Sequence, residues 1–350
     1  MSFERLDSLT DPSELARILG PIEGIRLEPL QGQTSGFSSS SHKLVHVARA
    51  GGRPITLRLK RTHVGEDWIA RLMRTTAPGR EAMLLAEPRL ATVWDTFARP
   101  YLAYAVEGGE VGLLMEDHSL GCVPDVREPV SLETEDRLMD CLADFHGRFW
   151  QSPLLSLPWL TQPEWYADVL GPHQAVDPDA LRGAPQGIRD GVSAGWREAK
   201  ALLPAPVWER LTRPAAELWR AWSDLPRTLI HGDTKVANFA FLPDGRVAAF
   251  DWTNLGAAPA TLDIGWYLAV NGTRLHRSKE DFIARYRELL EARLGSPLPD
   301  ALWERMMDAA VFSGARMLLW SKAVGLRENT PYRRGDWDWW AERLAAWSRR

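Results

Sequence analysis

Alternating apolar and polar residues predict a small antiparallel sheet in the first third of the chain. The period-two alternation that is typical of half-buried strands recurs in residues 25–30, 44–48 and 55–60. A Gly51-Gly52 turn joins the last two of these stretches. A fourth apolar run, residues 111–117, ends in acidic residues and is also expected to form a strand.

Helical spacing dominates the remainder of the chain. An early helix is expected in residues 8–20, with Thr10 or Asp11 as its N-cap and Gly20-Pro21 as its end. Beyond residue 130, apolar residues three and four positions apart predict longer helices in residues 134–150, 279–294 and 301–323. Together the two patterns predict an α+β protein in which an antiparallel sheet precedes a mostly helical region.

One apolar stretch, residues 229–252, contains a concentration of chemically active side chains. These are His231, Asp233, Lys235, Asn238 and Asp251. Two short apolar runs, residues 238–242 and 247–251, flank a Pro-Asp-Gly-Arg turn and predict a hairpin. A two-residue loop at Asp244 and Gly245 would place Asn238 opposite Asp251, whereas a one-residue bulge would shift the pairing by one place.

This hairpin is a candidate metal site. The Cβ atoms of directly opposed hairpin residues lie roughly 4.5–5.5 Å apart, so in this register the side-chain oxygens of Asn238 and Asp251 can share one divalent cation. Two hard oxygen ligands suit Mg²⁺, which takes its other ligands from water and substrate phosphates. Asp233, on the loop before the hairpin, can act as a base toward a hydroxyl without binding the metal. The alternative is a buried hairpin with two structurally satisfied aspartates.

The spacing Asp-x₄-Asn followed by Asp is that of protein-kinase catalytic loops. Here the loop reads His231-Gly232-Asp233 rather than His-Arg-Asp, and Trp252 follows the metal-binding Asp where protein kinases have Phe-Gly. With these departures, residues 25–325 resemble the aminoglycoside phosphotransferase and choline kinase-like family. The resemblance implies a two-lobed protein-kinase-like fold. Residues 1–117 would be the nucleotide-binding lobe, and residues 118–350 the catalytic and acceptor-binding lobe.

The resemblance also implies roles for three basic residues. Lys60, at the end of its strand, would hold the α- and β-phosphates of ATP and pair with a helix glutamate, for which Glu81 is the candidate. Arg58 stands where a small or apolar residue usually covers the adenine, and it is a competing phosphate ligand. Lys235, two residues after the base Asp233, matches the Asp-x-Lys of Ser/Thr kinases and would contact the γ-phosphate. A solvated lysine is the alternative for Lys235.

Two further segments are expected to bind the nucleotide. A loop rich in Gly and Ser can lay its backbone N–H groups over phosphates, and its candidate residues are Ser35, Gly36, Phe37 and Ser38. The backbone of Met115, Glu116 and Asp117 resembles the hinge that hydrogen-bonds the adenine edge. For the loop the alternative is a flexible hairpin turn, and for the hinge it is an ordinary core strand.

Other polar residues are expected to be structural. His146 lies on the apolar helix of residues 134–150 and is interpreted as a satisfied core histidine. Asp263 occupies the place of the family's Asp that opens a helix and braces the catalytic loop. The Trp- and Asp-rich segment 332–340 has two interpretations. It is either an acceptor pocket for cations or a helix face packed on the core.

Composition restricts the class of partner. The chain has 350 residues, of which 45% are hydrophobic and 25% charged, and its formal net charge is −4. This charge argues against nucleic acid or an anionic membrane as the partner. The start of the sequence lacks the basic and apolar regions of a signal peptide, and Cys122 and Cys141 are the two cysteines. A cytoplasmic location is therefore expected.

These features predict an enzyme that moves the γ-phosphate of ATP, with Mg²⁺, to a hydroxyl of a small molecule. The acceptor class would be an amino sugar, an aminoglycoside or an amino alcohol. No activation segment ending in Ala-Pro-Glu follows Asp251, as a kinase of protein substrates would need, and no P-loop motif occurs. The alternative function is a nucleotide-binding pseudokinase or a protein kinase-like regulator.

Overall fold

The computed structural model describes residues 1–30, 39–124, 128–175, 177, 179 and 181–350. The chain forms two compact units. Unit 1 comprises Met1–Cys122 and Phe239–Thr253, and unit 2 comprises Val123–Asn238 and Asn254–Arg350. The first division lies close to the expected lobe boundary after residue 117. The hairpin that follows Asn238 groups with unit 1, although it was expected in the C-terminal lobe.

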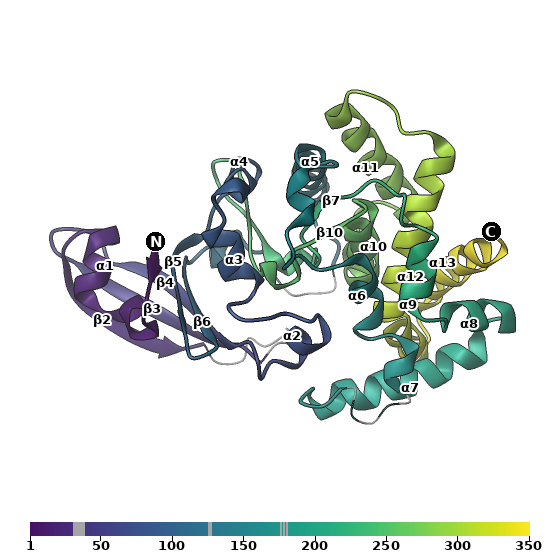
Figure 1. Cartoon of the computed structure of the whole chain (residues 1–350), viewed down its shortest axis with the longest axis horizontal. Coiled ribbons are helices and arrows are strands. Elements are labelled where there is room, and N and C mark those ends of the chain that lie inside the picture. Colours follow the sequence, from purple (N-terminus) through teal and green to yellow (C-terminus); the bar gives the residue numbers. More distant parts are fainter. Residues whose placement is uncertain (31–38, 125–127, 176, 178, 180) are drawn as a thin grey trace. The chain divides into compact units, whose positions relative to one another are not determined.

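Unit 1 is built on a six-stranded sheet (Figure 1). Its spatial order is β1-β5-β6-β4-β3-β2, and every pairing is antiparallel except that of β1 with β5. The strands are β1 (Ser2–Phe3), β2 (Ile22–Pro29), β3 (Ser41–Arg49), β4 (Ile55–His63), β5 (Tyr101–Glu107) and β6 (Glu110–Glu116). The three strands predicted from alternation are confirmed as β2, β3 and β4, and the one predicted from an apolar run is confirmed as β6.

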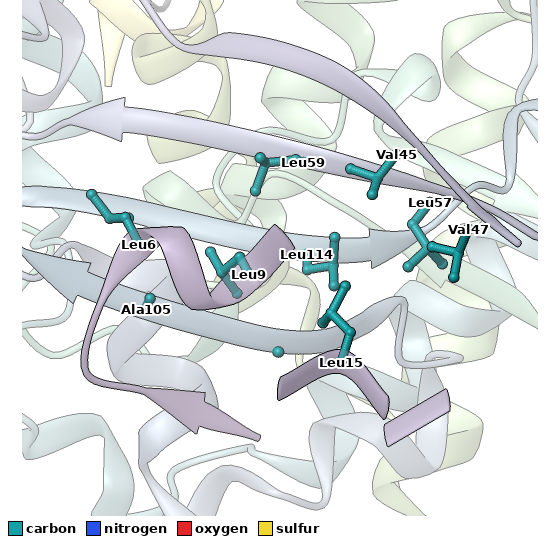
Figure 2. Close-up of a cluster of buried hydrophobic side chains, with 10 residues drawn as sticks. Leu6, Leu9, Leu15, Val45, Val47, Leu57, Leu59, Ala105 and Leu114 are labelled. Carbon is teal, nitrogen blue, oxygen red and sulfur yellow. The ribbon is translucent and has the colours of Figure 1, made fainter. Parts of the chain in front are cut away.

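One face of this sheet is covered by the N-terminal segment, as Figure 2 shows. The 3₁₀ helix η1 (Leu6–Thr10) and the helix α1 (Pro12–Leu19) pack their leucines against alternate residues of β3, β4 and β6. Leu57 and Leu59 of β4 are buried in this layer. Successive side chains of a strand point to opposite faces, so Arg58 and Lys60 lie on the other face. Each fully buried leucine contributes roughly 1.5–3 kcal/mol to this packing.

The predicted N-terminal helix is confirmed, and its cap is Asp11. The Asp11 carboxylate accepts the backbone N–H groups of Ser13 and Glu14 at 2.8 and 3.1 Å. Pro12 occupies the first helical position, where its missing N–H costs nothing. Gly20 ends the helix with a φ of +79°, a conformation that side chains disfavour. Unit 1 also contains α2 (Trp68–Leu72), α3 (Arg80–Ala86) and α4 (Val93–Thr96).

The hairpin in unit 1 joins β8 (Phe239–Phe241) to β9 (Val247–Ala249). Phe239 pairs with Ala249, which is one residue away from the register of a two-residue loop. Leu242 donates its N–H to Arg246 at 2.9 Å across a three-residue loop, and Gly245 adopts a φ of +90°. Continued by one pair, this register would match Asn238 with Phe250. Asn238 is therefore not paired with Asp251, and the hairpin has the alternative register, shifted by one place, because its loop holds three residues.

Unit 2 is mostly helical (Figure 1). Its helices are α5 (Leu132–Arg148), α6 (Pro163–Asp168), α7 (Gln186–Leu202), α8 (Ala205–Leu211), α9 (Ala215–Arg220), α10 (Thr261–Val270), α11 (Lys279–Leu294), α12 (Asp300–Gly325) and α13 (Pro331–Arg349). A short antiparallel pair joins β7 (Thr228–Ile230) to β10 (Gly256–Ala258). The three long helices predicted from spacing are confirmed as α5, α11 and α12.

The helices α10 and α12 lie close together because both carry glycine at their crossing. A Cβ on Gly265 would lie 2.4 Å from the carbonyl oxygen of Ala310, and one on Gly314 would lie 2.8 Å from the carbonyl oxygen of Gly265. On α13, the indoles of Trp337, Trp340 and Trp347 are buried, so the segment is a packed helix face. The acceptor-pocket interpretation of these tryptophans is therefore wrong.

Candidate active site

In unit 1, Lys60 lies between two carboxylates. Its Nζ donates to Oε2 of Glu81 on α3 and to Oδ1 of Asp251, each at 2.7 Å. The hydroxyl of Tyr101 donates to the other Glu81 oxygen at 3.0 Å. The lysine and Glu81 side chains are each 7% exposed, whereas that of Asp251 is 36% exposed. The predicted partner of Lys60 is thus in contact with it, and Tyr101 fixes that partner from behind.

The charges around Lys60 decide its protonation. Burial alone would lower the pKa of Lys60, but the neighbouring carboxylates of Asp251 and Glu81 raise it above its ordinary value. Burial also lowers the pKa of His42, on the adjacent strand, to about 4, and the positive charge of Lys60 adds to this effect. At neutral pH, the site therefore contains a charged lysine beside an uncharged histidine.

Asp251 follows β9 in a left-handed conformation, with a φ of +58°. Asp and Asn tolerate this region better than most residues because their short polar side chains bond locally. Thr253 makes such a local bond, since its Oγ1 donates to Oδ1 of Asp251 at 3.0 Å. The turn directs the carboxylate toward Lys60, and its partial exposure leaves it reachable by a ligand from solvent.

The competing candidate, Arg58, is held by a different partner. Its Nε donates to Oδ1 of Asp117 at 2.8 Å, while Ser119 contributes its N–H and hydroxyl to the same carboxylate. In the expected hinge, Met115 is buried and the N–H of Glu116 donates to the carbonyl of Pro100 at 2.9 Å. The Arg58–Asp117 pair therefore lies at the expected hinge, and Arg58 is two residues along the strand from Lys60.

In unit 2, the loop that carries Asp233 is braced by Asp263 at the start of α10. The Asp263 carboxylate accepts the N–H groups of His231 and Gly232, each at 2.8 Å. His146 is fully buried, with one ring nitrogen 3.1 Å from Asp263 and the other 2.6 Å from the hydroxyl of Tyr286. The interpretations of Asp263 as a brace and of His146 as a satisfied core histidine are both confirmed.

Gly232 explains why the loop does not read His-Arg-Asp. It has a φ of +78°, and a Cβ at this position would lie 2.3 Å from the carbonyl oxygen of Asn254. A side chain there would be strained by its backbone and would also collide with a neighbouring backbone. Glycine is consequently the residue that this loop geometry requires.

Asp233 itself is oriented from two sides. The indole Nε1 of Trp266 donates to its Oδ1 at 2.7 Å, and the amide Nδ2 of Asn238 donates to its backbone carbonyl at 2.9 Å. Asn271 supports the same loop by accepting the N–H of Val236 at 2.9 Å. Lys235 is partly buried on this loop.

Several of the contacts above involve residues that were not predicted from the sequence, among them Tyr101, Thr253, Trp266 and Asn271. Trp266 had a usable signal, because it lies three residues after Asp263 and therefore shares a helix face with it. Tyr101 and Asn271 act across long sequence separations, and no local pattern marks them.

Some expectations fall outside what the structure describes. Ser35, Gly36, Phe37 and Ser38, the candidate phosphate loop, lie outside the described residues. Within the described ranges, no group of three or more His, Cys, Asp or Glu side chains is arranged to hold a metal ion. Among the described helices, none is both long and apolar enough to cross a membrane.

A lysine paired with a helix glutamate in an antiparallel sheet, followed by a braced Asp loop in a helical unit, defines a kinase-like phosphotransferase. Residues 124–308 match the family model described as the phosphotransferase enzyme family. Because this match spans more than half of the chain, the protein belongs to that family. The predicted family and the predicted class of enzyme, a phosphotransferase with an alcohol group as acceptor, are confirmed.

Several solved structures are similar to this chain. Choline kinase LicA from Streptococcus pneumoniae is 13% identical, with a TM-score of 0.45 over 95% of this chain and 97% of that one. Choline kinase from Cryptosporidium parvum is 10% identical, with a TM-score of 0.49 over 97% and 94%. The GDP complex of aminoglycoside 2'-phosphotransferase-IIIa is 15% identical, with a TM-score of 0.44 over 96% and 97%. No curated protein sequence matches this chain.

Proposed function

We propose that this protein transfers the γ-phosphoryl group of ATP to a hydroxyl group of a small molecule. The observation that carries the proposal is the position of Lys60, which contacts Glu81 and Asp251 at 2.7 Å each. A buried lysine held by a helix glutamate is prepared to bind phosphate oxygens. Its second contact is with Asp251, whose carboxylate we propose as a ligand of Mg²⁺.

Asp233 is the proposed base. Its carboxylate accepts the proton of the substrate hydroxyl. Trp266 fixes the orientation of this carboxylate by donating a hydrogen bond to its Oδ1. Positioning is the main requirement, because the transition state of phosphoryl transfer is loose and the protein contributes little covalent chemistry. Lys235, two residues further on, is proposed to contact the γ-phosphate.

The residues proposed for Mg²⁺ fit a hard cation. Asp251 has a partly exposed carboxylate. Asn238 donates its amide nitrogen to the backbone carbonyl of Asp233, which leaves the amide oxygen of Asn238 available as an acceptor. Two protein oxygens are too few to hold the ion alone, in keeping with a metal that also binds nucleotide phosphates. When bound, Mg²⁺ would neutralise charge on the phosphates.

Other parts of unit 1 are proposed to bind the nucleotide. Ser35, Gly36, Phe37 and Ser38 would cover the phosphates, and the backbone of Met115, Glu116 and Asp117 would contact the base. The acceptor is proposed to belong to the amino sugar, aminoglycoside or amino alcohol class.

The test is Mg²⁺-dependent release of ADP from ATP, measured with a panel of amino sugars, aminoglycosides, amino alcohols and neutral alcohols. Asp233→Asn should abolish acceptor-dependent release and leave ATP affinity unchanged. Asp251→Asn should abolish release and also remove the Mg²⁺ dependence of ATP binding. Asp244→Asn is the matched control, because Asp244 is an exposed turn residue of the same hairpin.

Chelation of Mg²⁺ should stop turnover without unfolding the protein. ATP binding without turnover on any acceptor would favour the pseudokinase alternative. Full activity in Asp233→Asn would show that the base is wrongly assigned.

A further inference from the structure

The Asp233 loop, residues 231–238, contacts the helix α10 at both of the helix ends. At the start of α10, Asp263 accepts the N–H groups of His231 and Gly232, each at 2.8 Å. At the end of α10, the C-cap residue Asn271 contacts the later part of the loop, and Asn271 is only 1% exposed. The segment that follows Asp233 therefore has an anchor of its own.

The side chain of Asn271 bonds to the backbone on both sides of Lys235. Its Oδ1 accepts the N–H of Val236 at 2.9 Å, and its Nδ2 donates to the carbonyl of Thr234 at 3.0 Å. An asparagine amide has one acceptor oxygen and one donor nitrogen, so the opposite orientation of the amide would satisfy neither group. The two bonds fix both of the peptide groups that flank Lys235.

The same arrangement extends to Asn238. The carbonyl of Lys235 accepts the N–H of Asn238 at 2.8 Å, which closes the 3₁₀ turn η6 (Val236–Asn238). The amide of Asn238 donates in turn to the backbone carbonyl of Asp233 at 2.9 Å. Because peptide groups are planar, fixing those around Lys235 restricts the direction that the chain takes to Asn238. Asn271 thus acts on Lys235 and Asn238 together.

Asn271 is itself held at the end of its helix. Its N–H donates to the carbonyl of Tyr267 at 2.9 Å. The ammonium group of Lys322, on α12, donates to the carbonyl of Ala269 in the last turn of α10 at 2.7 Å, and it pairs with Asp336 of α13 at 2.8 Å. A short side chain on an anchored backbone loses little conformational entropy when it bonds to the loop.

We propose that Asn271 is a positioning residue for phosphoryl transfer, because its amide sets the backbone that carries Lys235 and Asn238. This inference rests on the proposed function and adds to it a residue that acts through the loop. Phosphoryl transfer depends on positioning more than on covalent chemistry of the protein. A small displacement of the two loop residues therefore lowers the rate.

The first test is Asn271→Ala, which removes both bonds to the loop. The kcat for acceptor-dependent ADP release should fall on the order of a hundredfold, since a displacement of about 1 Å can have this effect. The affinity for ADP should not change, because ADP lacks the γ-phosphoryl group that Lys235 is proposed to contact. Amide hydrogen exchange at Val236 should become faster, and this readout needs no ligand.

Thr261→Val is the matched control for a general loss of stability. Thr261 is fully buried on the same helix, and its hydroxyl donates to the carbonyl of Met306 on α12 at 2.6 Å rather than to the loop. This variant should lower the midpoint of thermal unfolding, as Asn271→Ala does. It should leave kcat and the exchange at Val236 unchanged.

Asn271→Asp gives a readout that a merely structural role would not give. An ionised carboxylate repels the carbonyl of Thr234, whereas a protonated carboxyl has an acceptor oxygen and an O–H donor, as the amide does. Burial raises the pKa of such a carboxyl. The kcat of this variant relative to the wild type should therefore rise as the pH falls from about 8 to about 5. The same ratio for Asn271→Ala should stay constant, because titration of other groups cancels in the ratio.

Three results would overturn the inference: an unchanged kcat in Asn271→Ala, an equal loss of kcat in Thr261→Val, or a ratio for Asn271→Asp that does not rise on acidification. Failure of the proposed function is distinguishable, because the wild type itself would then release no ADP with any acceptor. Exchange at Val236 would in that case still decide whether Asn271 holds the loop.

Discussion

The indole N–H of Trp266 donates a 2.7 Å hydrogen bond to the carboxylate of Asp233. Trp266 lies three residues after Asp263, which accepts the N–H groups of the loop that carries Asp233. One face of α10 thus holds both the backbone of this loop and the side chain of its central residue. The side chain of the proposed base is therefore oriented by a helix, whereas its backbone carbonyl is held by Asn238, five residues further along the chain.

Trp266→Phe should lower kcat about tenfold while leaving the KM for ATP unchanged, because the ring packing is kept and one orienting hydrogen bond to the base is lost. Steady-state kinetics at saturating ATP would measure this. Trp339→Phe is the matched control, since Trp339 also donates its indole N–H to a carboxylate, that of Glu280, but away from Asp233. An unchanged kcat in Trp266→Phe would show that the bond does not position the base.

Lys60→Met should abolish ATP binding and also destabilise unit 1. Removing one partner of a buried ion pair leaves an uncompensated charge and costs about 3–5 kcal/mol of unfolding free energy. Titration calorimetry and urea denaturation would measure the two effects. The double variant Lys60→Met with Glu81→Gln should recover much of the stability but none of the ATP binding.

Lys43→Met offers a control on the neighbouring strand. Lys43 pairs with Leu59 in the register, so its side chain lies on the face opposite to that of Lys60. This variant should bind ATP as the wild type does. Equal loss of binding in both variants would mean that the effect of Lys60→Met reflects disruption of the sheet.

Asp263→Asn should unfold or loosen the Asp233 loop. The carboxylate accepts two backbone N–H groups, and an amide would present a donor to one of them, at a cost of roughly 2–4 kcal/mol. Hydrogen exchange at His231 and Gly232 would report the loosening directly. Asp300→Asn, at an exposed helix start, is the control and should leave exchange unchanged. Unaltered exchange in Asp263→Asn would contradict the bracing role.

His42 should make the stability of unit 1 depend on pH below neutrality. Burial lowers its pKa from 6.5 to about 4, so between these values the unfolded chain binds a proton that the folded protein does not. The stabilisation is fully present above pH 6.5 and is lost as the pH falls toward 4, by an amount on the order of 3 kcal/mol. Urea denaturation across this range would measure it.

His42→Gln should flatten this pH dependence, because the substituted side chain does not titrate. An equally steep loss of stability in the variant would assign the effect to other groups.

The elements with a regular pattern were predictable from the sequence. The strands β3 and β4 follow from alternation, and α11 begins and ends at the predicted residues, Lys279 and Leu294. The strand β5 was missed because its inward positions, Ala103 and Ala105, are small and contrast weakly with their neighbours. The sequence left the register of the hairpin open by one residue, since loops of two and three residues share the same turn composition.

The sequence by itself was enough to propose the reactive groups, because the spacing of Asp233, Asn238 and Asp251 is local and the loop around them is short. Tertiary structure decided which groups meet over long separations. Glu81 meets Lys60, and Trp266 meets Asp233, through packing of elements that no local pattern connects. Tertiary structure also decided that the tryptophans near the C-terminus are buried in the core, since burial depends on the surface against which a helix packs and not on the helix alone.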